Sequence, residues 1–332
     1  MHQIRWFAPN RYCTLPVDAL RRSGIDVATT GEEPAQLVFA ADGVPAVAAW
    51  QFSRRIRAPL VVYLWDLPPW QLGQGRAHPV VPLAGRLVKV PRLWGAYPER
   101  AGYYSRLRYI ARRAAAVWAP SEASRMAIEA HFDVPCERVP FCFDSDRFRR
   151  DAGWTRPVGV PVVLAISRLV PYKNHAAVIR AAAIVSSRPS VHIVGAGTEA
   201  AALRQLAAEL GVALRLDEVW QSDQQVLDAY LGASVVVSAS RFEGLGLTPL
   251  EAIALGIPTV ASDIPTHREF TAGKARLVAL DHDIALATAI DNALRFGGGS
   301  GVGSGPVLPE LTIEACATRL QSRFERWLTR DS

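Results

Sequence analysis

The sequence contains no long apolar segment. Its longest purely apolar run, residues 59–65, falls far short of the ~20 residues that a membrane-spanning helix requires. Residues 1–5 also lack the charged start and the extended apolar stretch of a secretory signal. These absences predict a protein without a transmembrane helix that works in the cytoplasm, with the inner face of the cell membrane as an alternative location.

Cysteine and lysine are both scarce. The four cysteines, Cys13, Cys136, Cys142 and Cys316, are scattered and show no CxxC spacing. This argues against a disulfide framework and favours a reducing compartment. The seven histidines show no close pairing with metal-ligand spacing, so we expect no required metal. Only three of the 37 basic residues are lysines, which gives extra weight to a lysine in a candidate motif.

Positive charge is concentrated in the first half of the chain. Residues 1–150 hold 21 Lys and Arg against 13 Asp and Glu, whereas residues 151–332 hold 16 against 18. The densest segment, residues 85–113, mixes basic residues with tyrosine and tryptophan and contains one acid. Its basic residues are Arg86, Lys89, Arg92, Arg100, Arg106, Arg108, Arg112 and Arg113. Such a mixture suits an anionic membrane surface or an anionic acceptor; a solvated face of an arginine-rich chain is the plainer alternative. No nucleic-acid-binding module accompanies the charge, so we expect no nucleic-acid partner.

Short β-branched runs alternate with helical stretches along the chain. This alternation is typical of parallel sheets with crossover helices, and 332 residues suit two domains of roughly 150 residues each. Strands are expected at 4–7, 36–39, 59–65 and 116–119, and then at 161–167, 191–194, 213–216, 234–238, 259–262 and 276–279. We therefore place an N-terminal α/β domain at 1–148, a C-terminal α/β domain at 149–310 and an amphipathic helix at 311–332.

The first segment suited to chemistry is residues 167–173, Ser-Arg-Leu-Val-Pro-Tyr-Lys. It follows a strand end and precedes a helix that Asn174 is expected to cap. Arg168 and Lys173 beside that helix N-terminus would stabilise negative charge on a leaving group such as a diphosphate. A basic surface loop is the plainer alternative.

The second segment, residues 241–252, follows the strand at 234–238. Its glycines allow a ligand to approach the backbone closely, and the carboxylate of Glu243 can accept hydrogen bonds from sugar hydroxyls. Glu251 has two interpretations. Residues 248–251, Thr-Pro-Leu-Glu, have the pattern of a capping box, so the start of a helix could by itself explain this glutamate.

A glycine turn at residues 195–200, Gly-Ala-Gly-Thr-Glu-Ala, follows a strand, and Asp217 comes some twenty residues later. This spacing is similar to a dinucleotide-binding fingerprint. The turn follows the second strand of its domain and not the first, which makes NAD binding the weaker alternative.

The two charged segments resemble those of the retaining glycosyltransferases of family 4, also called glycosyl transferases group 1. The likeness includes the Ser-Arg-Leu loop with its Lys173, the seven-residue separation of Glu243 and Glu251, Gly256-Ile-Pro258, and residues 262–269. It covers about residues 160–270. The resemblance implies the α/β fold called GT-B, in which two Rossmann-like domains face across a cleft and the C-terminal helix returns to the N-terminal domain.

The resemblance also implies roles for matching residues. The catalytic group would be Arg168 and Lys173 on the donor diphosphate, with Glu243 on the transferred sugar. Donor binding would further involve Gly244, Leu245 and Gly246, with Glu251 on the ribose. At the expected base pocket Trp220 replaces the glycine of the family, and we expect this ring to pack near the base. Asp144-Ser-Asp146 mimics a metal-binding DxD, but the family carries an aspartate in this interdomain connection. Retention in the family is explained by front-face attack, in which a donor phosphate oxygen takes the acceptor proton, so no protein nucleophile is needed.

The N-terminal half departs from the family pattern. Residues 8–13 replace the usual glycine-rich turn, and Trp65-Asp66 replaces a frequent His-Asp pair. Trp65, Asp66, Trp70 and Arg11 are candidates for the acceptor side, because aromatic rings pack on sugar faces and a carboxylate can orient hydroxyls. Core packing is an equally good interpretation of the tryptophans.

Together these features predict an enzyme that moves a hexose with retention and without a metal or cofactor. Its substrate would be an NDP-sugar, GDP-mannose or a UDP-hexose, bound mainly by residues 149–310. The acceptor would be a glycan, glycolipid or related molecule in cell-envelope polysaccharide synthesis, with peripheral contact to an anionic membrane through residues 85–113. The alternatives are a soluble natural-product glycosyltransferase and a catalytically silent sugar-binding GT-B protein.

Overall fold

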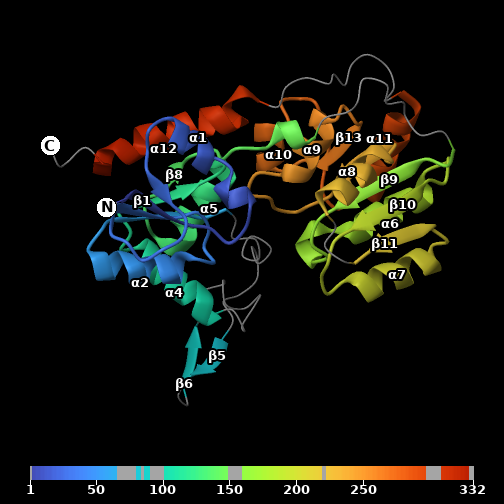
Figure 1. Cartoon of the computed structure of the whole chain (residues 1–332). Helices are drawn as coiled ribbons and strands as arrows, with labels where there is room; N and C mark the ends of the chain where they lie inside the picture. The colour runs from blue at the N-terminus through green and yellow to red at the C-terminus, as the bar shows by residue number, and fades with distance from the viewer. Residues whose placement is uncertain are drawn as a thin grey trace. The chain divides into compact units, whose positions relative to one another are not determined.

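A computed structural model of the chain describes residues 2–65, 80–83, 86–89, 101–148, 159–218, 222–296 and 308–328. The chain divides into two compact units (Figure 1): unit 1 is Met1–Phe143 with Pro309–Ser332, and unit 2 is Asp144–Leu308. The division falls a few residues before each boundary expected from the sequence. Each unit contains a six-stranded parallel sheet.

Unit 1 is built on a sheet with the order β2-β1-β3-β4-β7-β8. Its strands are β1 (His2–Phe7), β2 (Val27–Ala28), β3 (Ala35–Ala40), β4 (Leu60–Tyr63), β7 (Ala116–Ala119) and β8 (Glu137–Arg138). Its helices are α1 (Val17–Arg22), α2 (Ala46–Ile56), α4 (Ala101–Ala111), α5 (Glu122–Phe132) and α12 (Ile313–Leu328), with 3-10 turns η1 (Tyr12–Thr14) and η6 (Pro309–Leu311). An antiparallel pair, β5 (Val80–Leu83) and β6 (Arg86–Lys89), was not expected from the sequence.

Helix α12 completes the core of unit 1. It packs on α1 and β3, and Figure 1 shows α12 in red along the blue α1. Cys316, Leu320 and Phe324 recur every four residues and are fully buried, which forms the apolar stripe of an amphipathic helix. The Phe324 ring lies 5.4 Å from Phe39 and 5.5 Å from Trp118. The predicted return of the C-terminal helix to the N-terminal domain is therefore confirmed. Burial of Leu320 and of Phe324 stabilises the fold by about 1.5–3 kcal/mol each.

Unit 2 has the strand order β11-β10-β9-β12-β13-β14. The strands are β9 (Val162–Ile166), β10 (Ser190–Val194), β11 (Leu214–Asp217), β12 (Val235–Ser238), β13 (Thr259–Ser262) and β14 (Arg276–Val278). The helices are α6 (His175–Ile184), α7 (Ala200–Glu209), α8 (Asp223–Leu231), α9 (Leu247–Ala254), α10 (Pro265–Phe270) and α11 (Asp283–Phe296), with 3-10 turns η4 (Ser145–Arg147) and η5 (Pro171–Lys173). Every residue of β12 is buried, which is why its sequence reads as a continuous β-branched run.

Candidate active site

The two charged segments leave the same edge of the unit 2 sheet. Strands β9 and β12 are parallel neighbours, with Val163 opposite Val235 and Leu164 opposite Val236. The loops that follow their carboxyl ends therefore emerge together, at the edge where open α/β sheets bind ligands. The register of two buried strands brings residues 167–173 and 241–252 to one place.

Lys173 and Glu243 form an ion pair between these loops. The Nζ atom of Lys173 donates to Oε1 of Glu243 at 2.7 Å and to Oε2 at 2.8 Å, and the side chains are only 10% and 12% exposed. Burial by itself raises the pKa of Glu243, but the adjacent Lys173 ammonium, helped by His267 and a hydrogen bond from Ser240, outweighs this effect, and the pKa lies below its ordinary value. Glu243 is therefore an ionised hydrogen-bond acceptor at neutral pH.

Arg168 stands at the start of the same loop, with its side chain exposed. One of its guanidinium nitrogens donates to the hydroxyl of Tyr172, and Tyr172 itself is buried. The Nζ atom of Lys173 lies 5.2 Å from the centroid of the same ring. Tyr172 thus supports both cations of the predicted diphosphate-binding loop.

His175 contacts the start of this loop through its imidazole ring. Its Nε2 atom lies 2.9 Å from Ser167 Oγ and 3.3 Å from the carbonyl oxygen of Arg168. Burial lowers the pKa of His175 to about 4, so the imidazole is neutral at physiological pH. This histidine holds the backbone that carries Arg168.

The predicted capping of helix α6 by Asn174 is wrong. Asn174 has a left-handed backbone (φ 57°, ψ 38°) and makes no side-chain capping bond. A capping side chain normally belongs to a residue with an extended backbone, whereas asparagine is one of the few residues that tolerate the left-handed conformation. Here it turns the chain sharply from η5 into the helix.

The glycine turn at 195–197 packs against this loop. Gly195 and Gly197 have positive φ angles, and an added Cβ would lie 1.9 Å from the Ser167 carbonyl oxygen and 2.2 Å from that of Leu169. The N–H of Gly195 already donates to the Asp217 carbonyl at 3.0 Å. These glycines allow protein backbone to approach, so they do not form an open cradle for a dinucleotide pyrophosphate.

Glu251 is held by a tyrosine, and the capping box expected at residues 248–251 is absent. Helix α9 begins at Leu247 after Gly246, which has φ 76°, and no side chain caps it. The Thr248 hydroxyl instead donates to the Ile166 carbonyl at 2.7 Å. Oε2 of the buried Glu251 accepts a hydrogen bond from the Tyr230 hydroxyl at 2.5 Å, so partners from distant parts of the chain replaced the local bonds.

His267 is a site residue to which the sequence analysis gave no role, although it lies within the matched segment 262–269. It is 1% exposed, and its Nδ1 lies 2.8 Å from the Ser262 carbonyl, so Nδ1 carries the proton. Burial lowers the pKa of His267. Among the described residues Nε2 has no hydrogen-bond partner, and it lies beside Gly246, where an added Cβ would be 3.5 Å away. The ring thus presents a buried acceptor next to the glycine loop.

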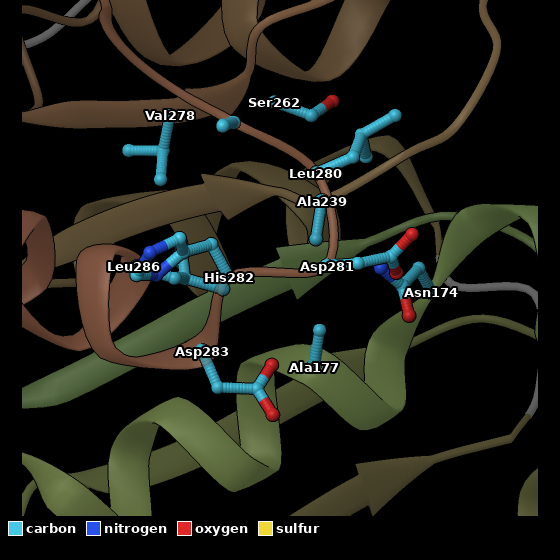
Figure 2. A pocket seen from close by; sticks show the side chains of 11 residues that line it. Asn174, Ala177, Ala239, Ser262, Val278, Leu280, Asp281, His282, Asp283 and Leu286 are labelled. Carbon is cyan, nitrogen blue, oxygen red and sulfur yellow. The ribbon is translucent and has the colours of Figure 1, made fainter.

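A small cavity lies at the same sheet edge. Its walls come from the residue after β12, the ends of β13 and β14, and the first turns of α6 and α11. Figure 2 shows Asn174 and Asp281 on one side of it and His282 with Leu286 on the other. Its volume is about 20 Å³, room for about one water molecule. The cavity is therefore too small for a nucleotide.

The acceptor-side candidates are placed only in part. Trp65 packs on Phe141 at a centroid distance of 4.9 Å and donates from Nε1 to the Ala41 carbonyl, so this ring is engaged with its own unit. Arg11 is exposed, directly before η1. Asp66, Trp70 and the base-pocket candidate Trp220 lie outside the described residues, as do residues 85 and 90–100 of segment 85–113. In that segment Arg112 pairs with Asp133 at 3.0 Å.

The described residues contain neither a membrane-spanning helix nor a cluster of metal ligands. No helix in these ranges is long and apolar enough to cross a membrane. In the same part of the chain, no three His, Cys, Asp or Glu side chains gather as a metal site.

The fold of the chain matches that of solved structures. Anabaena HepE in complex with UDP-glucose matches 99% of this chain and 96% of its own with a TM-score of 0.64 and 17% identity. The apo form of WaaB, a lipopolysaccharide outer core galactosyltransferase, matches 96% and 98% with a TM-score of 0.62 and 12% identity. Identities this low show the fold alone, and the fold is GT-B with two Rossmann-like domains.

The amino-acid sequence is similar to a known family and to characterised proteins. Residues 146–296 match the family model for Glycosyl transferases group 1. A GDP-mannose-dependent alpha-(1-6)-phosphatidylinositol monomannoside mannosyltransferase of Mycolicibacterium smegmatis is 31% identical over 207 residues, 56% of this chain and 51% of the relative. A D-inositol 3-phosphate glycosyltransferase of Acidothermus cellulolyticus is 36% identical over 137 residues, 36% and 30% of the two chains. The chain thus spans about half or less of the length of these relatives.

Proposed function

We propose that this chain is a retaining family 4 glycosyltransferase that moves a hexose from an NDP-sugar to a glycan or lipid-linked acceptor of the cell envelope. The observation that carries the proposal is the buried Lys173–Glu243 pair at the ligand-binding edge of a sheet whose sequence matches group 1 glycosyltransferases. The pair places an ammonium and an ionised carboxylate side by side, as a sugar joined to a diphosphate requires.

The N–H donors of Lys173 allow it to hold Glu243 and to bind the donor diphosphate at the same time. An ammonium has three N–H donors, and the two Glu243 oxygens occupy two of them. The third remains for a phosphate oxygen, beside the exposed guanidinium of Arg168, which can bind phosphate through two parallel bonds. As the glycosidic bond breaks, these cations stabilise the charge on the leaving diphosphate, while Glu243 accepts hydrogen bonds from sugar hydroxyls.

The remaining roles concern the nucleoside and the stereochemistry. Glu251, fixed by Tyr230, accepts from the ribose hydroxyls, and the backbone of Gly244, Leu245 and Gly246 lies against the sugar. The acceptor attacks from the face that the diphosphate leaves, and a donor phosphate oxygen takes its proton. This route requires no metal, cofactor or protein nucleophile.

The relatives suggest which donor and acceptor to test first. Two of them are named as GDP-mannose-dependent mannosyltransferases acting on phosphatidylinositol mannosides, and another as a lipopolysaccharide core mannosyltransferase. GDP-mannose and a glycolipid acceptor are therefore the first pair to test, with UDP-hexoses next. Such an acceptor would place the enzyme in the cytoplasm at the inner face of the membrane.

Donor binding and turnover can be measured separately. A donor that binds the folded state raises its melting temperature by mass action, so GDP-mannose or a UDP-hexose should stabilise the protein. Arg168→Ala should lose the shift, whereas Arg276→Ala, at an exposed position in β14, should keep it. Release of NDP with an acceptor, and an α-linked product from an α-linked donor, would support retaining transfer. Stabilisation by NAD and by no NDP-sugar would overturn the proposal.

A further inference from the structure

Unit 1 contains an open basic pocket at the amino edge of its sheet. It is lined by the last turns of α2, the segment that leads into β4, and the residues just before β7, and its volume is about 570 Å³. This lies within the range of small-molecule sites. Three arginines, Arg54, Arg57 and Arg113, line it, and no acidic side chain does.

Aromatic rings hold two of these arginines in place. The Arg113 guanidinium lies 3.7 Å from the Tyr109 ring centroid, and that of Arg54 lies 5.7 Å from the ring of Trp50. Trp50 and Tyr109 meet edge to face at 6.3 Å. Nη1 of Arg113 also donates to the Tyr109 carbonyl oxygen at 3.3 Å. Stacking on a ring orients a guanidinium, and the remaining N–H donors at its edge face outward for a ligand. The two cations are thus arranged before any ligand arrives.

The three arginines that line the pocket differ from the arginines next to them in the sequence, which are paired with carboxylates. Arg55 pairs with Glu32, and Arg112 pairs with Asp133. Within the described part of the chain, none of Arg54, Arg57 and Arg113 forms an ion pair with a carboxylate. The helix dipole also favours basic residues at helix C-termini. This effect acts on the paired and the unpaired arginines alike, so it does not explain why three arginines share a pocket without acids.

We propose that this pocket binds a phosphate or diphosphate group of a second ligand. Arginine matches phosphate geometry through paired N–H donors, and Trp50 supplies an apolar wall for the group that carries the phosphate. The pocket lies at the starts of β4 and β7, whereas the donor loops follow the carboxyl ends of strands in unit 2. The inference therefore does not depend on the glycosyltransferase proposal.

Arginine-directed modification by phenylglyoxal, read by peptide mass spectrometry on the full chain, can locate the bound group. Pyrophosphate should protect Arg57 and Arg113 and leave Arg55 and Arg112 unprotected, although all four are exposed. Phosphatidylcholine vesicles with and without phosphatidylglycerol form a second arm. Protection by pyrophosphate identifies a soluble phosphate ligand, and protection by the anionic vesicles alone identifies a lipid headgroup. No selective protection in either arm would overturn the proposal.

A matched pair of double variants tests affinity at equal charge. Protection of Arg54, the lining arginine that both double variants keep, reports the binding. Arg57→Gln with Arg113→Gln should weaken this binding by about tenfold or more, because each charge-assisted hydrogen bond lost accounts for about that factor. Arg55→Gln with Arg112→Gln should change it less than about twofold. Equal weakening in both variants would show only a general charge effect. Thermal unfolding of each variant confirms that it is folded.

Discussion

The ammonium of Lys173 lies within 2.8 Å of both carboxylate oxygens of Glu243, a residue 70 positions further along the chain. Because water reaches neither group freely, each charge depends on the other for its stabilisation. The pair is consequently part of the folded structure of unit 2 as well as of the proposed donor site. Binding and stability can be separated by changing one partner or both.

Lys173→Met should destabilise unit 2 by about 3–5 kcal/mol, because it leaves the Glu243 carboxylate buried without a counter-charge. Lys173→Met with Glu243→Gln should cost less than Lys173→Met alone, since the second change removes the stranded charge. Urea unfolding gives both free energies. Additive losses in the double variant would show that the two groups do not interact energetically.

Tyr230→Phe should weaken donor binding through Glu251. The buried Tyr230 hydroxyl orients the Glu251 carboxylate, and losing one such bond costs about 1–3 kcal/mol. We expect KM for the donor to rise several-fold with kcat little changed, and the preference for ribose over 2′-deoxyribose nucleotides to fall. Tyr172→Phe, which alters the Arg168 loop instead, should leave that preference intact. A loss of stability with unchanged ribose preference would restrict Tyr230 to a structural role.

Gly197→Ala should disrupt the loop that carries Arg168. The new methyl would overlap the Leu169 carbonyl, with 2.2 Å between the atoms, whereas at Gly211, which also has positive φ, no atom lies within 4 Å. Gly211→Ala should therefore cost only the backbone strain, on the order of 1 kcal/mol, and Gly197→Ala distinctly more, with weaker donor binding. Similar midpoints of urea unfolding for the two variants would contradict this explanation.

The sequence predicts correctly those features that depend on residues close together in the chain, and it fails where contacts between distant residues decide. The spacing of Cys316, Leu320 and Phe324 is a local pattern, and it correctly predicted an amphipathic helix. The capping box at residues 248–251 is also a local pattern, but the Thr248 hydroxyl found a carbonyl 82 residues away in the sequence. No single-sequence pattern contains such a distant partner.

The glycine turn illustrates the same limit. A Gly-x-Gly spacing indicates that something approaches the backbone closely, and the approach to Gly195 and Gly197 is real. The sequence could not say that the approaching atoms belong to residues 167–169 of the same chain. The pairing of Lys173 with Glu243 likewise required the register of β9 on β12.

Phe324→Ala should loosen the C-terminal helix from unit 1. Its ring contacts Trp6, Phe39 and Trp118, and truncating a fully buried phenylalanine costs about 3–5 kcal/mol. Ser322→Ala, at an exposed position of α12, should be nearly neutral. Hydrogen exchange should accelerate in α12 and β3 of the Phe324 variant; exchange unchanged from wild type would show that the helix contributes little to the stability of unit 1.

His175 should make the protein less stable in acid. Its pKa in the folded state is about 4, below the ~6.5 of an unfolded histidine, so the unfolded state binds more protons between these values. The free energy of unfolding therefore falls as pH decreases from about 6.5 to about 4, by at most ~1.4 kcal/mol per pH unit from this group. His175→Gln removes the titration, and its unfolding free energy, measured in urea at several pH values, should change less steeply across that window. His267, whose pKa is also lowered, still titrates in the variant, so the slope should decrease without vanishing. An identical slope in both proteins would show that His175 is not held neutral beneath the Arg168 loop.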